Sequence, residues 1–213
     1  MTRKELEAKA IAAVEALFAG EASGHDAAHS LRVYRTAMQI AASEPCDEET
    51  VMLAALLHDA DDVKLFHTAN DANARRIMAD CGVAPEQAER VLAAIRTVSF
   101  KGTDSVTPET IEGKIVQDAD RLDALGAIGI ARAFAYGGAK GRVMYDPAIP
   151  PEMDMDEARY RAHRGTTVNH FYEKLFLLRE KLNTQTARRI AVRREAFMRE
   201  FLDEFYAEWE GSR

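Results

Sequence analysis

His58 and Asp59 are the adjacent side chains best suited to bind a metal ion. They follow Val51–Leu57, a segment without a polar side chain, and a helix that is apolar on every side normally lies at the centre of a core. An imidazole and a carboxylate at the end of such a helix need partners, because burying an unpaired ion costs several kcal/mol. One metal ion satisfies both groups, and the pair suits Mn, Fe, Co or Ni, with Mg and Zn as alternatives. By itself the pair also fits a solvated helix end, so other residues must decide.

Two further segments carry ligand-type side chains at helical positions. His29 lies in the first turn of a helix expected from about Asp26 to Ser43, and three aspartates lie midway along a helix expected from about Pro108 to Tyr136. The order of a histidine, a His-Asp pair and a distant aspartate resembles the HD-domain metal-dependent phosphohydrolase superfamily, and most of all its bacterial YedJ-type HD proteins. The motifs that carry the resemblance extend over nearly the whole chain: Ala54–Asp59, Ala119–Ala124, Tyr136–Gly138, Asn169–Leu175 and Asn183–Thr184.

The resemblance implies four metal ligands: His29, His58, Asp59 and Asp120. On a helical wheel of about 100° per residue, geometry does not choose among Asp118, Asp120 and Asp123. The string Ala-Asp-Arg-Leu at 119–122 does choose, because it resembles the fourth-ligand segment of the guanosine tetraphosphate hydrolases, in which the aspartate binds metal. Asp123 is held in reserve as a residue that orients a ligand or its water.

A single metal ion is expected. HD proteins that hold two metals resemble this pattern but have extra histidines before the last aspartate, whereas His67 is the one histidine between Asp59 and Asp120. Four protein ligands leave positions for water and substrate. A divalent ion there would polarise a phosphoryl oxygen and lower the pKa of its water toward neutrality.

A general base is expected within one water of the metal. Asp62, four residues after His58, is our candidate, because acidic residues just after the His-Asp pair have this role in hydrolases that this chain resembles; Asp61 is the alternative. Both also fit a solvated helix end. Three cations are candidates to stabilise phosphate charge: Lys64 and Arg121 as catalytic groups and Arg32 as a substrate-binding group. Each of them also fits an ordinary surface ion pair.

An arm rich in glycine and proline, from Gly137 to Pro151, breaks the helical pattern. Its side chains Lys140, Arg142 and Tyr145 are candidates for substrate binding, with the arm acting as a lid or as a base-recognition loop. Loops of this length inside a compact domain are often functional, although a connection without function is equally compatible with the composition.

The rest of the chain reads at helical period, without runs of alternating β-branched residues. Helices are expected at 2–19, 26–43, 70–81, 85–98, 108–136, 157–182 and 184–210, together with the apolar helix that Asp47 caps. The expected fold is all-α, an HD-domain helical bundle. We expect one domain over 1–213, with 137–156 as the lid loop and 157–210 as a C-terminal helical extension.

Composition excludes several classes of protein. The 213 residues carry 28 basic and 35 acidic side chains, a formal net charge of −7 that disfavours a nucleic acid polymer as partner. The two cysteines, Cys46 and Cys81, lack the spacing of a zinc knuckle or a disulfide framework, which fits reduced thiols in the cytoplasm. The charged start, and the lack of an apolar run of about 18 residues, argue against export and a membrane span.

The resemblance implies that metal-activated water hydrolyses a phosphomonoester or phosphoanhydride of a small molecule. Similarity to HD nucleotide pyrophosphohydrolases and nucleotidases indicates a nucleotide, although no residue identifies the base or the bond. Two alternatives stay open. One is a non-catalytic regulatory module that binds metal and nucleotide. The other is oxygenation, which the missing interior histidines disfavour because it uses paired irons. The sequence does not fix the oligomeric state.

Overall fold

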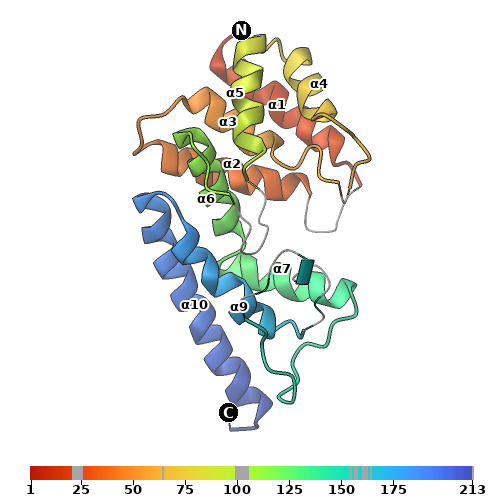
Figure 1. Cartoon of the computed structure of the whole chain (residues 1–213), viewed down its shortest axis with the longest axis vertical. Coiled ribbons are helices and arrows are strands. Elements are labelled where there is room, and N and C mark those ends of the chain that lie inside the picture. The colour runs from red at the N-terminus through yellow and green to blue at the C-terminus, as the bar shows by residue number, and fades with distance from the viewer. Residues whose placement is uncertain are drawn as a thin grey trace. The chain divides into compact units, whose positions relative to one another are not determined.

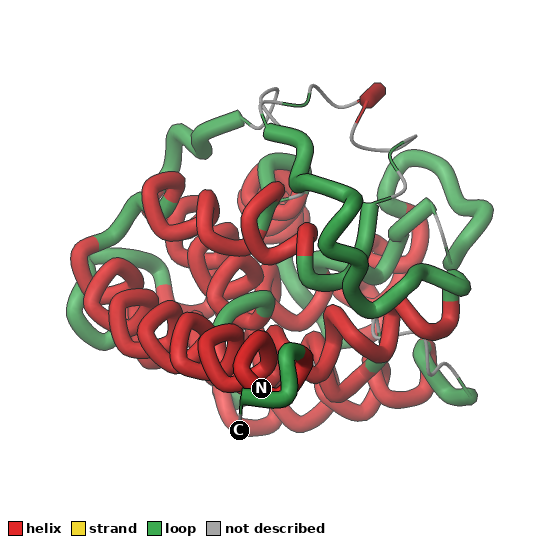
Figure 2. Tube along the Cα trace, turned by 90° about the horizontal axis from the view of Figure 1, so that it is seen from below, coloured by secondary structure: helices red, strands yellow, loops and turns green. Residues whose placement is uncertain are grey.

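The structure, a computed structural model, describes residues 1–20, 26–63, 65–98, 106–153, 155, 158–159, 163 and 165–212. All regular elements in these residues are helices (Figure 2), which confirms the predicted all-α fold. Within the same residues, no helix is both long and apolar enough to cross a membrane. The described chain divides into two compact units, of which the first contains the residues up to Asp120 and the second begins at Arg121.

The first unit is built around one central helix (Figure 1). Its helices are α1 (Arg3–Leu17), α2 (Ala27–Ala41), α3 (Glu48–Leu57), α4 (Ala72–Asp80), α5 (Pro85–Ile95) and the first part of α6 (Ile111–Asp123). Helix α3 packs against α1, α2 and α5, and all of its residues from Thr50 to Leu57 are buried. This arrangement confirms the prediction that the apolar helix is central, and the end of α3 delivers His58 directly from the core.

Aspartate caps fix the starts of the two helices that lead to the candidate site. The side chain of Asp26 accepts a hydrogen bond from the His29 amide (2.8 Å), which places His29 in the first turn of α2. Asp47 caps α3 as predicted, accepting from the amides of Glu49 (3.1 Å) and Thr50 (3.4 Å). Caps satisfy amides that a helix leaves without an internal partner. They therefore set where each helix begins and the directions of its later side chains.

The second unit is held together by aromatic rings. It consists of the end of α6, α7 (Gly126–Ala139), α9 (Asn169–Glu173), the 3-10 helix η2 (Leu175–Lys181) and α10 (Gln185–Trp209). Helix α10 packs against α7 and η2. The ring centroid of Phe134 on α7 lies 5.8 to 6.2 Å from those of Phe171, Phe201 and Phe205. Aromatic side chains bury a large apolar area, so this cluster joins α7, α9 and α10.

The prediction of one helix over 108–136 is wrong, because the chain turns between α6 and α7. Gly126 has a φ of +76°, a left-handed conformation that suits glycine, and the stem of Arg194 passes 3.1 Å from where a Cβ would lie. The Arg194 guanidinium also donates a hydrogen bond to the Leu122 carbonyl at the end of α6. The turn depends on a residue much later in the chain, which the local hydrophobic pattern does not reveal.

Two other predicted boundaries are wrong, whereas the last is confirmed. Helix α7 continues through Gly137 to Ala139, so the irregular arm begins later than predicted. The helix predicted at 157–182 is not continuous. Among its described residues, the helices of five or more residues are the short α9 and η2, which meet at Lys174. The helix predicted at 184–210 is α10.

Gly129→Ala is expected to destabilise the second unit, because a Cβ at this position would lie 2.2 Å from the Ala124 carbonyl oxygen. Backbone cannot move aside as a flexible side chain does, so we expect a loss of about 1–3 kcal/mol in the free energy of unfolding. The control is Gly138→Ala in the same helix, where a Cβ meets nothing within 4 Å and where alanine should be neutral or stabilise by up to ~1 kcal/mol. Urea unfolding followed by Trp209, the single tryptophan, measures both variants. Equal stabilities would contradict this reading of the turn.

Candidate metal centre

Four side chains from the first unit converge on one point. His29 comes from the first turn of α2, His58 and Asp59 directly follow α3, and Asp120 lies on α6. The Nε2 atoms of the two histidines are 3.2 Å apart. Asp59 Oδ2 lies 3.4 Å from His29 Nε2 and 3.5 Å from His58 Nε2. Asp120 Oδ1 lies 3.4 Å and 3.8 Å from the same two nitrogens, so both carboxylates face the pair of imidazoles.

These separations fit the ligand shell of a single divalent cation. Ligands at about 2.1 Å from a metal lie about 3.0 Å apart at octahedral angles and about 3.4 Å apart at tetrahedral angles. The observed separations, 3.2 to 3.8 Å, are of this size. His29, His58 and Asp120 also form a group whose potential ligand atoms all lie within 4.8 Å of one another. Imidazoles combined with carboxylates suit first-row divalent ions, so donor set and spacing both fit a metal site.

A hydrogen bond prepares His58 to act as a ligand. Its Nδ1 lies 2.9 Å from the Ala55 carbonyl oxygen. A carbonyl oxygen only accepts, so Nδ1 carries the proton and the lone pair of Nε2 faces the other three side chains. Hydrogen bonds to the remote ring nitrogen fix the orientation of metal-binding histidines in this way. His58 is therefore held in the tautomer that binds a cation through Nε2.

The carboxylates form the solvent-accessible side of the site. The side chains of His29 and His58 are 1% and 3% exposed, whereas those of Asp59 and Asp120 are 15% and 26% exposed. Burial acts to raise the pKa of Asp120, but the hydrogen bond with His29 and the charges that His58 and His29 carry when protonated outweigh it and hold this pKa below its usual range. Asp120 is therefore ionised at neutral pH, as a metal ligand must be.

The two acidic residues after the His-Asp pair differ in their surroundings. Asp61 accepts three hydrogen bonds, from the Thr68 hydroxyl (2.6 Å) and from the amides of Asn73 (2.9 Å) and Ala74 (3.0 Å). These hydrogen bonds engage both carboxylate oxygens of Asp61 in holding the neighbouring backbone and Thr68, so Asp62 is kept as the candidate base. Asp62 is half-buried, and its role stays a prediction. Lys64, the predicted catalytic cation, lies outside the described residues.

Among the three aspartates of α6, the structure brings Asp120 to the histidines. Asp123 instead forms an ion pair with Arg132, with 2.6 Å between Oδ2 and Nη1, and both residues belong to the second unit. Asp118 is fully buried. The geometry therefore favours Asp120, the aspartate that the Ala-Asp-Arg-Leu string indicated and that the helical wheel did not single out.

The predicted phosphate-binding cations occupy different environments. Arg32 is half-buried on α2. Arg121 is buried in the second unit, where its guanidinium donates a hydrogen bond to the Lys181 carbonyl at the end of η2. This support of a helix end is a contact that the sequence did not reveal. The roles of Arg32 and Arg121 toward phosphate stay predictions.

The arm lies against its own unit. Lys140 Nζ and the Arg142 guanidinium lie 5.7 Å and 5.8 Å from the ring centroid of Tyr136. The Tyr145 ring packs edge-on at 5.2 to 5.9 Å from three rings of α10: Phe205, Tyr206 and Trp209. Sequence reasoning missed this aromatic contact, whose signal is the spacing of aromatic residues every four positions along the last helix. Binding of substrate by Lys140, Arg142 and Tyr145 stays a prediction.

His170, on α9, is expected to make the stability of the second unit depend on pH. Burial lowers the pKa of His170 to about 3, and the charges of Lys174, Arg142 and His163 act in the same direction. The unfolded imidazole titrates near pH ~6.5, so below that pH the unfolded chain binds a proton that the folded chain does not. Stability should therefore fall as the pH drops from about 6.5 toward 3, by at most about 1.4 kcal/mol per pH unit.

The pH effect of His170 is measured against His170→Gln, which cannot titrate. Urea midpoints followed by Trp209 fluorescence are measured between about pH 7.5 and 4.5. As the pH falls over this range, the free energy of unfolding of the wild type should decrease more steeply than that of the variant. Parallel curves would show that His170 does not carry this dependence.

Comparison with known proteins identifies the family to which this chain is similar. The model of the HD domain matches residues 26–125, a range that contains all four converging residues. Bacillus subtilis YpgQ is 41% identical over 193 residues, covering 89% of this chain and 86% of YpgQ. The crystal structure of YpgQ in complex with ADP superposes with a TM-score of 0.78 over 98% of this chain and 97% of that one; over this longer, structure-based alignment the identity is 34%.

Two other solved structures are similar over almost their full length. A Lactobacillus plantarum protein has a TM-score of 0.84 and 39% identity, with 99% of both chains covered. An HD-superfamily hydrolase from Bacillus thuringiensis has a TM-score of 0.78 and 41% identity, with 98% of this chain and 99% of that chain covered. Similarity of this extent and identity, together with the matching HD domain, is more than a shared fold. The chain belongs to the HD-domain superfamily of hydrolases.

Proposed function

We propose that this protein is a metal-dependent phosphohydrolase that acts on a phosphomonoester or phosphoanhydride of a small molecule, with a nucleotide as the substrate class. The observation that carries the proposal is that His29 Nε2 and His58 Nε2 lie 3.2 Å apart and that Asp59 Oδ2 and Asp120 Oδ1 each lie 3.4 to 3.8 Å from both of them. The complex of YpgQ with ADP supports the nucleotide class, because that protein is 41% identical over most of both chains.

The same four side chains would hold one divalent ion, with Mn, Fe, Co, Ni or Mg as candidates. When bound, such an ion supplies a coordinated water of lowered pKa and polarises a phosphoryl oxygen. The protein's own task is to hold the two carboxylates and the Nε2 atoms of the two imidazoles toward one point. The hydrogen bond between His58 Nδ1 and Ala55 O serves this task by turning the Nε2 lone pair of His58 inward.

Asp62 is the base of the proposed reaction. Attack of water on phosphorus forms one P–O bond and breaks the P–O bond to the leaving group, and the proton lost by the water passes to Asp62. The leaving oxygen then takes up a proton from Asp62 or from solvent. Lys64 and Arg121 are the candidates from the sequence to stabilise the charge on the phosphoryl oxygens. Arg32, Lys140, Arg142 and Tyr145 are the candidates from the sequence to bind the remainder of the substrate.

The test is a screen of nucleoside mono-, di- and triphosphates with Mn, Fe(II), Co, Ni and Mg in turn, with His58→Ala as the inactive control. Release of phosphate or of pyrophosphate is measured separately, because the two products identify different cleaved bonds. We expect one of them to appear with at least one metal and to disappear in His58→Ala. Nucleotide binding with no product under any metal would support the non-catalytic module instead.

A further inference from the structure

We propose that Asp61 is a positioning residue for the metal centre, because its carboxylate ties the turn that carries His58 and Asp59 to the first turn of α4. The inference rests on the proposed function, which supplies the centre to be positioned. The sequence offered Asp61 only as an alternative base. Its contacts give it a different task, which we describe as the Asp61 cap: the hydrogen bonds from Thr68, Asn73 and Ala74.

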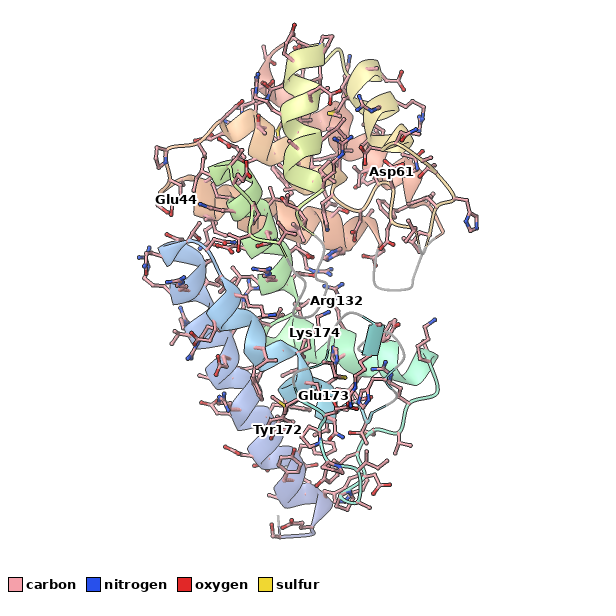
Figure 3. All side chains as sticks on the ribbon, viewed as in Figure 1. Glu44, Asp61, Arg132, Tyr172, Glu173 and Lys174 are labelled. Atoms are coloured by element: carbon pink, nitrogen blue, oxygen red, sulfur yellow. The ribbon has the colours of Figure 1, made fainter. Side chains whose placement is uncertain are left out.

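The Asp61 cap replaces a cap that α4 lacks. Asp71 occupies the N-cap position of α4 but makes no side-chain capping hydrogen bond. The second and third amides of the helix, at Asn73 and Ala74, donate instead to Asp61 Oδ1 (2.9 Å) and Oδ2 (3.0 Å), and Asp61 lies beside this end of α4 (Figure 3). These are the amides that an N-cap side chain normally satisfies. Asp61, from the turn that carries His58 and Asp59, therefore caps the start of α4.

Asn73 closes the connection from the other side. Its side-chain amide donates to the Ala60 carbonyl (2.8 Å), while its backbone amide donates to Asp61. The turn itself is held by hydrogen bonds from the Ala60 amide to Leu57 O (3.0 Å) and from the Asp62 amide to Asp59 O (3.1 Å). Two consecutive residues of the turn are thus fixed to α4 immediately after the His-Asp pair. The direction of the Asp59 carboxylate depends on this backbone.

An ion pair and a hydrogen bond hold the entry to α4 in place. Asn70 and Asp71 have φ values of 57° and 56°, a left-handed conformation in which asparagine and aspartate are the commonest residues after glycine. The Arg96 guanidinium binds Asp71 Oδ2 through Nη2 (2.6 Å) and Nε (3.0 Å), and Arg75 Nε donates to the Asn70 carbonyl (3.1 Å). These contacts bring the first turn of α4 to Asp61.

Asp47 offers a matched control within the same unit. Like Asp61, it accepts from a threonine hydroxyl, Thr50 Oγ1 at 2.7 Å, and from two backbone amides, at 3.1 and 3.4 Å. It caps the first turn of α3, the end of that helix opposite His58. Asp47 also accepts from Gln87 Nε2 at 3.1 Å, so Asp47→Asn disturbs at least as many hydrogen bonds as Asp61→Asn. Only Asp61→Asn lies beside the proposed ligands.

The experiment compares wild type, Asp61→Asn and Asp47→Asn in three measurements. Mn²⁺ affinity is titrated by the electron paramagnetic resonance of the free ion, stability by the urea midpoint, and local opening by amide hydrogen exchange of peptides spanning 58–66 without metal. An asparagine at 61 turns an NH2 group toward an amide donor, so the Asp61 cap cannot form fully. We expect both variants to lose stability, and only Asp61→Asn to bind Mn²⁺ about tenfold or more weakly and to exchange faster at 58–66.

Several outcomes would overturn the proposal. Unchanged Mn²⁺ affinity in Asp61→Asn, or an equal loss in both variants, would leave Asp61 as an ordinary helix cap. If the wild type itself binds no Mn²⁺, the proposed function fails, and the exchange measurement alone then decides whether the Asp61 cap holds the turn. Should Asp61→Asn not fold, Thr68→Val replaces it with the same expectations, because this change keeps the shape of the side chain and removes the hydroxyl that donates to Asp61 Oδ1.

Discussion

His58→Ala is expected to abolish binding of the divalent cation and to lower phosphate release by about 10³-fold or more. Its Nε2 lies 3.2 to 3.8 Å from the ligand atoms of His29, Asp59 and Asp120, so alanine removes the one donor that faces all three of them. Without the cation, the attacking water keeps a high pKa and the phosphoryl oxygens lose their strongest positive partner. Metal content by elemental analysis and phosphate release by a continuous assay measure the two effects together.

His67→Ala is the control for His58→Ala, because His67 is exposed and belongs to the same unit. It removes an imidazole without touching the converging side chains, so metal content and turnover should both equal those of the wild type. Retention of metal and activity by His58→Ala would contradict the proposed site. Equal losses in the two variants would point to a general effect of removing histidine from the chain.

Asp62→Asn is expected to lower kcat about 10²–10⁴-fold while metal content stays unchanged. An asparagine preserves the size of the side chain but cannot accept the proton that the attacking water loses. Substrate binding should change little, so KM is expected to stay near its wild-type value. Steady-state kinetics and metal analysis of the same preparation separate these effects.

The control for Asp62→Asn is Asp80→Asn on α4, whose carboxylate is 70% exposed and lies 3.8 Å from Arg76. It should leave kcat and metal content unaltered. If Asp62→Asn instead loses metal, Asp62 is a ligand and not the base. If its kcat is unchanged, the proton goes elsewhere.

The position of the two imidazoles could be predicted because local chemistry determines it. An apolar helix must be central, and the residue that ends it emerges from the core, which is where His58 lies. Asp26 likewise predicts a helix start that places His29 in the first turn. The choice of Asp120 required the resemblance, because an isolated helical wheel carries no information about which neighbouring element faces the helix.

The turn between α6 and α7 could not be predicted for a tertiary reason. It is stabilised by Arg194, which donates to the Leu122 carbonyl and lies close to Gly126. Glycine in a helical sequence permits such a turn but does not require one, because it costs only about 1 kcal/mol within a helix. The break in the predicted helix 157–182 is similar, since the aromatic cluster around Phe171 brings together distant segments.

The contacts of Asp61 with α4 could not be predicted from its place next to the His-Asp pair. Asp61 and Asp62 are equivalent in sequence as acidic neighbours of the His-Asp pair. They differ because α4 begins with a residue whose side chain does not cap it, so the helix takes its acceptors from Asp61. A capping relation across twelve or thirteen positions has no local signature, whereas Asp26 and Asp47 cap the residues that follow them directly.

Anomalous diffraction at the manganese edge, from crystals loaded with Mn²⁺, is the sharpest test of the metal centre. We expect one peak in the first unit, about 2.0–2.3 Å from His29 Nε2, His58 Nε2, Asp59 Oδ2 and Asp120 Oδ1. A loaded crystal with no peak among these atoms, or with Mn²⁺ bound to other side chains instead, would contradict the proposed metal centre.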